Sequence, residues 1–142
     1  MATVLTIEIA TLLKAGLVAV VPDTVSVYAD GVKDNPTPTG DKVQLPAVTI
    51  QPSEYLPMQY RSRQCAFPVR IALTTWNPSD EAQVVLYETA AAIGRYLGTA
   101  TLALTLGTFD AIIVDTLPER ADLERLQTIA WECMVHVLRP AS

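Results

Sequence analysis

The carboxy-terminal stretch "TIAWECMVHVL", residues 128–138, constrains the fold of this chain more than any other segment. Every second residue is apolar, and the residues between are mostly polar or small. The apolar positions are Ile129, Trp131, Cys133, Val135 and Val137. Because successive side chains of a strand point to opposite faces, this period of two predicts a long β-strand with one face in a core.

A second long strand is predicted for "QCAFPVRIALTTW", residues 64–76, where the same alternation recurs. Pro68 interrupts this run, and proline cannot donate a hydrogen bond to a neighbouring strand. We therefore expect the early half of the strand to be an edge or a bulge. Shorter strands are predicted at residues 25–29, 47–51 and 109–116, whereas "TLALTL", residues 101–106, is strand or irregular.

Two segments have helical spacing. Apolar residues from Leu5 to Leu13 predict a helix at about residues 3–15, which Gly16 would end as a left-handed cap. The second helix covers residues 77–97, with Asn77 as N-cap, Pro78 in the first turn and Gly98 at its end. Its expected buried stripe is Val85, Leu86, Thr89, Ala90, Ile93 and Leu97.

These elements predict a single α+β domain over residues 1–142. The sheet is expected to be mostly antiparallel or mixed, with the two main helices packed on one face. Proline-bearing segments without periodicity predict long loops at about residues 31–45 and 52–63. The segment 117–127 is interpreted as a connection, in which Arg120 and Glu124 could pair across one helical turn.

Composition narrows the class of protein. A chain of 142 residues can bury a core without disulfides or metals, and a formal charge of −5 disfavours a general role in binding nucleic acid phosphates. Cys65 and Cys133 fall on apolar strand faces, which favours buried thiols over a disulfide between the strands. Glu8 and Lys14 interrupt the apolar amino terminus, so we expect neither an export signal nor a membrane span, and expect a cytoplasmic protein.

No set of residues predicts catalysis, a cofactor or a metal. His136 is the single histidine and has no zinc-binding spacing around it, so an exposed or interface role is favoured. The serines lack a nucleophile-elbow signature, and no phosphate-binding glycine loop is present. Asp110 and Asp115 have opposite phase on one strand and therefore cannot act as an acid and base pair. The chain is not expected to be an enzyme.

One cluster combines cationic and aromatic residues. Arg61, Arg63 and Arg70 lie near Tyr55 and Tyr60 in the sequence. Such a cluster could stack on nucleic acid, but the negative net charge favours a protein interface, where Arg and Tyr are common anchors. Open strand edges also invite association, so association is a hypothesis for the function itself.

In pattern and order, the chain resembles the tail terminator proteins of long-tailed bacteriophages, the minor tail protein U class of tail completion proteins. The resemblance lies in the helix "TIEIATLLKAG", the extended loop after the first strand, and "CAFPVRIALTTW" running into "NPSDEAQVVLYETAAAIGRYL". It ends with the closing pair "FDAIIVDT" and "QTIAWECMVHVLRP", and so covers most of the chain.

The resemblance implies a homohexameric ring in the virion, assembled in the host cytoplasm. The ring would sit on the head-proximal end of the tail tube, stop tube polymerisation and contact head completion or neck proteins, while DNA passes through its lumen without specific binding. The family implies no catalytic residue and no cofactor.

For the contacts of such a ring we predict three places on this chain. Pro68 and its neighbours, with Arg70, would lie at a subunit boundary. Tyr60, Arg61 and Arg63 would contact the tube or a neighbouring subunit, and the loop from Asp34 to Lys42 would order on assembly.

Two alternatives stay open at this point. Another neck component, such as a head-tail connector or stopper, also forms rings from small mixed folds. A small oligomeric cytosolic enzyme would instead need a concave site with convergent polar groups.

Overall fold

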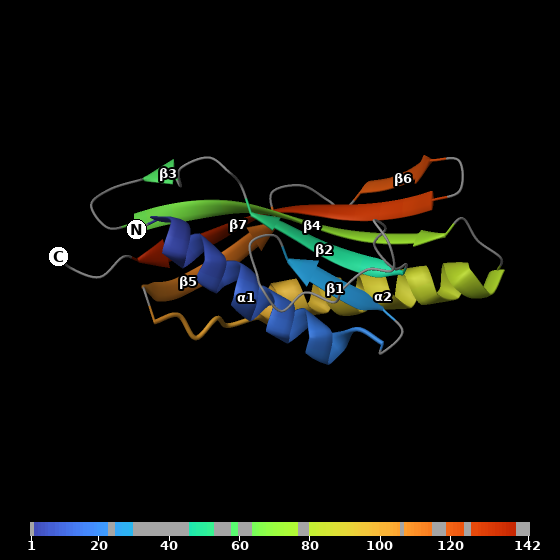
Figure 1. Ribbon diagram of the computed structural model, residues 1–142, viewed down its shortest axis with the longest axis horizontal. Coiled ribbons are helices and arrows are strands. Elements are labelled where there is room, and N and C mark those ends of the chain that lie inside the picture. Colours follow the sequence, from blue (N-terminus) through green and yellow to red (C-terminus); the bar gives the residue numbers. More distant parts are fainter. Residues whose placement is uncertain are drawn as a thin grey trace.

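A computed structural model describes residues 2–22, 25–29, 46–52, 58–59, 64–76, 80–105, 107–114, 119–123 and 126–138. Figure 1 shows the elements of this part of the chain packed as helices on one side of a twisted sheet. The helices are α1 (Ala2–Val20) and α2 (Asp80–Thr99). The strands are β1 (Ser26–Ala29), β2 (Ala47–Pro52), β3 (Met58–Gln59), β4 (Gln64–Trp76), β5 (Thr108–Val114), β6 (Glu119–Leu123) and β7 (Leu126–Leu138).

The centre of the sheet is the antiparallel pair of β4 and β7. All thirteen residues of each strand are paired, from Gln64 with Leu138 to Trp76 with Leu126, without a register shift. Matching periods of two place the apolar phases of both strands on the same face, which becomes the inner side of the sheet. The two long strands predicted from alternation are therefore confirmed, and they pair with each other.

On the edge that faces away from the β4–β7 pair, each long strand pairs with two shorter strands. β2 pairs with β4 from Val69 to Thr74, and β3 pairs with Cys65 and Ala66 of the same strand. On the other side, β5 pairs with the second half of β7 and β6 with its first half. β1 adds the single parallel pairing among the described strands, next to β2, so the sheet is mixed.

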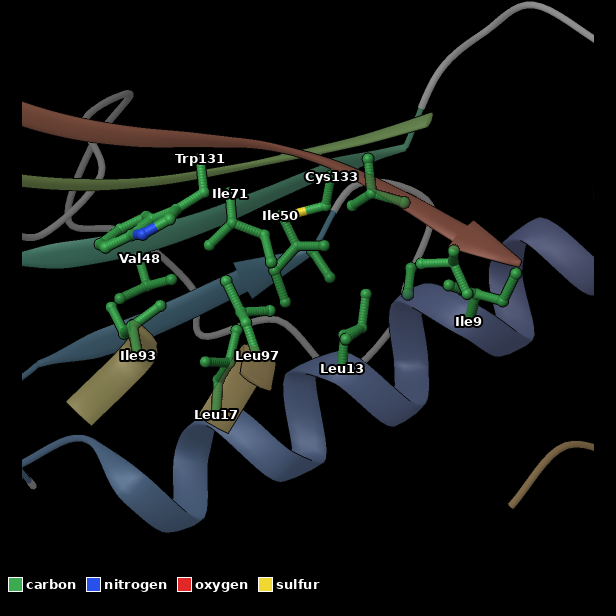
Figure 2. Packing of buried hydrophobic residues seen from close by; sticks show 14 of the residues in the cluster. Ile9, Leu13, Leu17, Val48, Ile50, Ile71, Ile93, Leu97, Trp131 and Cys133 are labelled. Atoms are coloured by element: carbon green, nitrogen blue, oxygen red, sulfur yellow. The ribbon is translucent and has the colours of Figure 1, made fainter. Parts of the chain in front are cut away.

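Both helices pack on the inner face of the sheet, as the sequence predicted. α1 contacts β1 and β2, while α2 contacts β4, β5 and α1. Figure 2 shows Leu13 and Leu17 of α1 directed toward the sheet, near Leu97 of α2, and Trp131 lying over Val48. Removing such side chains from water is worth about 1.5–3 kcal/mol each, so this interface supplies most of the driving force for the fold.

The expected stripe of α2 is confirmed wherever its side chains are described. Leu86, Thr89, Ile93 and Leu97 are buried, and Ala90 packs against the core. Asn77 and Pro78 lie outside the described residues. The cysteine prediction is also confirmed, since Cys65 and Cys133 are buried thiols that are not joined by a disulfide.

The predicted end of the first helix is wrong. α1 continues through Gly16 to Val20. Gly16 faces Tyr96 of α2 at a point where a Cβ atom would overlap the ring and hydroxyl of the tyrosine. Glycine therefore leaves room here for the side chain of Tyr96 against α1, and it does not act as a left-handed cap. Burial at this contact raises the pKa of the Tyr96 hydroxyl, so the phenol stays neutral.

The interpretation of residues 117–127 as a connection that could be helical is also wrong. Glu119–Leu123 forms β6, which pairs with β7 so that Leu123 lies opposite Leu126. The sequence "ERADL" has little strand preference of its own, and the paired edge of β7 overrides that preference. Similarly, the short strand β3 lies inside the loop predicted at about 52–63.

The effect predicted for Pro68 is only local. β4 is an interior strand whose early half pairs with β7 throughout and with β3 at Cys65 and Ala66, so it is neither an edge nor a bulge. Among the described residues, Phe67 and Pro68 lack a partner only on the side of β2 and β3. Pro52, which pairs with Val69, also has no N–H to donate, and this favours a non-hydrogen-bonded pair at Pro52 and Val69. Because the backbone groups of successive strand residues point to opposite sides, the nitrogen of Pro68 then points toward the side of β2 and β3.

The contact between Gly16 and Tyr96 can be tested by adding a methyl group. We expect Gly16→Ala to lower the free energy of unfolding by about 1–2 kcal/mol, because the steric cost exceeds the gain in helix propensity. In a Tyr96→Ala background the same change should instead stabilise the protein by up to about 1 kcal/mol. Urea denaturation of the four proteins measures both effects.

Gly94→Ala is the matched control, because nothing lies within 4 Å of a Cβ atom at this exposed position of α2. It should stabilise the protein by up to about 1 kcal/mol through helix propensity alone. An equal response at Gly16 and Gly94 would contradict the role assigned to Tyr96.

Candidate assembly interface

Most of the predicted interface residues lie outside the described part of the chain. These are Asp34, Lys42, Tyr60, Arg61 and Arg63. Pro68 and Arg70 are described, and both belong to the outer phase of β4, opposite the helices. Pro68 is half-buried in the middle of the sheet, away from the outermost strands. Their contact with another subunit stays a prediction.

Arg70 is an ion-pair partner within the subunit. Its Nε donates to Oε1 of Glu132 at 3.0 Å, and Glu132 is the residue directly opposite on β7. Both side chains are about half exposed, so solvent screens the pair and its contribution to stability is small. Four residues further along β4, Thr74 contacts Thr128 across the same strands at 3.3 Å. These outer-face pairs favour the observed register over a slip of two residues.

β1 and β5 are the two strands at the ends of the main strand order, and β5 is the more exposed of the two. It pairs with β7 on one side, and no other described strand pairs with its opposite edge. Ile113 and Val114, near its end, have 49% and 36% of their surface exposed. The register shifts between Phe109 and Ala111, so Asp110 is an extra residue that bulges out of the pairing. The bulge and the charge of Asp110 disfavour pairing of another strand along the first half of this edge. The uncharged segment Ala111–Val114 has neither feature and no described partner on this side.

β1 and β5 differ strongly in exposure. At the opposite margin of the sheet, Val27, Tyr28 and Ala29 of β1 are all buried. In β5 the corresponding inward positions, Phe109 and Ile112, are only partly buried. Of the two outermost strands, β5 is therefore the better candidate for pairing with another chain.

The helices also carry exposed apolar side chains. On α1 these are Ile7, Val18 and Val20, and on α2 they are Val84 and Tyr87. A surface helix normally presents charged residues to water, so these side chains are a second candidate for contact with protein. None of the described helices is long and apolar enough to span a membrane.

Two parts of this surface were missed from the sequence. Ile113 and Val114 belong to "AIIV", which was expected only as the part of a strand between Asp110 and Asp115. The lack of alternation in those four residues is the available signal, because a strand with one wet face should alternate. Glu8 was used only to argue against a membrane span, and no local signal indicated its contact with Thr105, which is 97 residues away.

The described residues include no group of three His, Cys, Asp or Glu side chains placed to hold a metal ion. His136 lies half-buried on the outer phase of β7, opposite Ala66 on one side and Ala111 on the other. Asp110 is exposed at the bulge of β5, and Asp115 lies outside the described residues.

The chain shares its fold with a chain of a solved virion. The structure is described as the virion of a native gene transfer agent particle, and the two chains superpose with a TM-score of 0.65 at 15% sequence identity. The match covers 91% of this chain and 93% of the other. No protein family model and no curated protein matches the sequence.

A double-mutant cycle measures how much the ion pair between Arg70 and Glu132 contributes to stability. We expect Arg70→Ala and Glu132→Ala to show a coupling of about 0.2–1 kcal/mol in low salt, because the pair is half exposed. In about 1 M salt, where the screening length is roughly 3 Å, the coupling should fall toward zero. Urea unfolding measures it, and a coupling that is large and independent of salt would contradict this account.

Proposed function

We propose that this protein is a structural component of a phage-like virion and acts as the tail terminator. The observation that carries the proposal is the agreement of fold with a virion chain over nearly the whole length of both molecules. The order of elements read from the sequence, with its likeness to tail terminators, supports the same role. The function would then depend on shape and contact, without a catalytic group.

An open strand edge suits such a role. When one surface of a subunit binds a different surface of the next, the assembly closes into a ring if the rotation between subunits closes. We propose that the segment Ala111–Val114 of β5 supplies one side of this contact by strand pairing. A closed ring leaves no free copy of that edge and so cannot grow into a filament.

In this proposal the ring is a hexamer on the head-proximal end of the tail tube. One face stops the addition of tube subunits and the other face meets head completion or neck proteins. DNA would pass through the lumen without specific binding, as suits a chain of net charge −5.

Reconstitution with purified components tests the role. The protein should bind the end of growing tail tubes and stop their elongation, which tube lengths in negative-stain images measure. Binding to the portal side of tail-less heads, with no effect on tube length, would contradict the terminator role and favour a head-tail connector or stopper. Native mass spectrometry of the bound assembly gives the number of subunits.

The contact through β5 makes a separate prediction. Ile113→Lys should abolish the ring and the arrest of tubes, because a charge on an edge strand prevents its pairing with another strand. Its effect on unfolding should stay within about 0.5 kcal/mol, since the side chain is half exposed.

Val84→Lys is the matched control, an apolar-to-lysine change at an equally exposed position on α2. It should assemble normally. If Val84→Lys fails to assemble while Ile113→Lys succeeds, the subunit contact lies on the helix instead of the strand edge.

A further inference from the structure

Residues 100–105, which follow α2, reach the first helix without regular secondary structure. Residues 100–105 are irregular, and within them the N–H of Leu104 donates to the carbonyl of Leu102 at 2.9 Å. Leu102 is buried in the core and Leu104 packs against it. We name residues 100–105 the strap. Two leucines thus hold its apolar side.

The polar end of the strap is held by Glu8. One carboxylate oxygen of Glu8 accepts the backbone N–H of Thr105 at 2.8 Å, and the other accepts the hydroxyl of the same residue. Both oxygens of one side chain on α1 therefore bind a single residue of the strap. Hydrogen bonds to an ionised acceptor are the stronger kind, and two of them together fix orientation as well as distance.

Immediately after the strap the chain passes closely over the end of β7. A Cβ atom on Gly107 would lie 2.8 Å from Cγ1 of Val137 and 3.0 Å from the carbonyl oxygen of Leu138. β5 begins at Thr108, three residues after Thr105. Thr105 therefore lies close in sequence to the point where β5 begins to pair with β7.

β5 itself is weakly held. Its side chains are exposed or only partly buried, it pairs with one described strand, and its register shifts at Asp110. Strand segments with few buried contacts open locally at low free energy. The two hydrogen bonds between Thr105 and Glu8 lie close in sequence to β5. They can therefore stabilise β5 against local opening, which its few buried side chains do only weakly.

From these contacts we infer that Glu8 is a latch that couples α1 to the open edge strand β5. While the carboxylate holds Thr105, β5 is kept against β7 and its outer edge is presented in a defined position. Release of the latch lets the strap and β5 open together without unfolding the β4–β7 centre. The consequence for ring formation rests on the proposed function, whereas the latch is a property of the subunit alone.

Hydrogen exchange on the isolated subunit tests the latch. Glu8→Ala removes both acceptor oxygens, so neither the N–H nor the hydroxyl of Thr105 keeps its partner on α1. We expect the amides of Thr105 and β5 to exchange about tenfold faster, while those of β4 and β7 keep their rates. Thr105→Val, which removes the hydroxyl and keeps the backbone N–H, should give a smaller acceleration confined to the same amides.

Glu88→Ala, at an exposed position of α2, is the control for loss of one glutamate side chain and its negative charge. Equal exchange rates in Glu8→Ala and Glu88→Ala would overturn the inference. Acceleration of β4 and β7 by the same factor as β5 would also overturn it, because Glu8 would then stabilise the whole domain. Neither result depends on tubes or rings, so failure of the latch and failure of the terminator role are separate outcomes.

Discussion

Every other element of this domain is placed by the pairing of β4 with β7. Thirteen residue pairs in unbroken antiparallel register bring two alternating sequences into phase, so that one continuous apolar face forms. On this side of the sheet α2 contacts β4 and β5 while α1 contacts β1 and β2, and four shorter strands extend the sheet directly from the two margins of the pair. A one-residue slip between the two strands would turn the apolar phase of one of them to the solvent face, which is why the hydrophobic pattern strongly specifies this register.

The same centre explains how the protein can have exposed margins and still be stable. Side chains from both helices and the long strands bury the inner face, so the outermost strands need to contribute little. β1 is buried, whereas β5 has exposed apolar residues, a bulge and a single described neighbour. An edge that a monomer would normally protect is then available for assembly, and the proposed function uses this property.

The errors of the sequence analysis share one cause. Gly16 matched a helix cap locally, but its role is set by Tyr96, eighty positions later in the chain. Residues 119–123 have no strand pattern, yet the free margin of β7 makes them a strand. Pro68 does remove a donor, but it lies where the structure describes no pairing partner on the side of β2 and β3, so no described ladder is interrupted. In each case a contact distant in sequence overrides a sound local preference.

The sequence by itself determined the two long strands, the second helix, the buried thiols and the α+β class, because period and burial are local consequences of side-chain chemistry. It also indicated association, through its proline-bearing loops and open strands. Only the tertiary structure decided which strand is the exposed edge, that Arg70 pairs with Glu132, and that Glu8 holds Thr105. These depend on which strands become neighbours and on side-chain positions across the sheet, which no local period encodes.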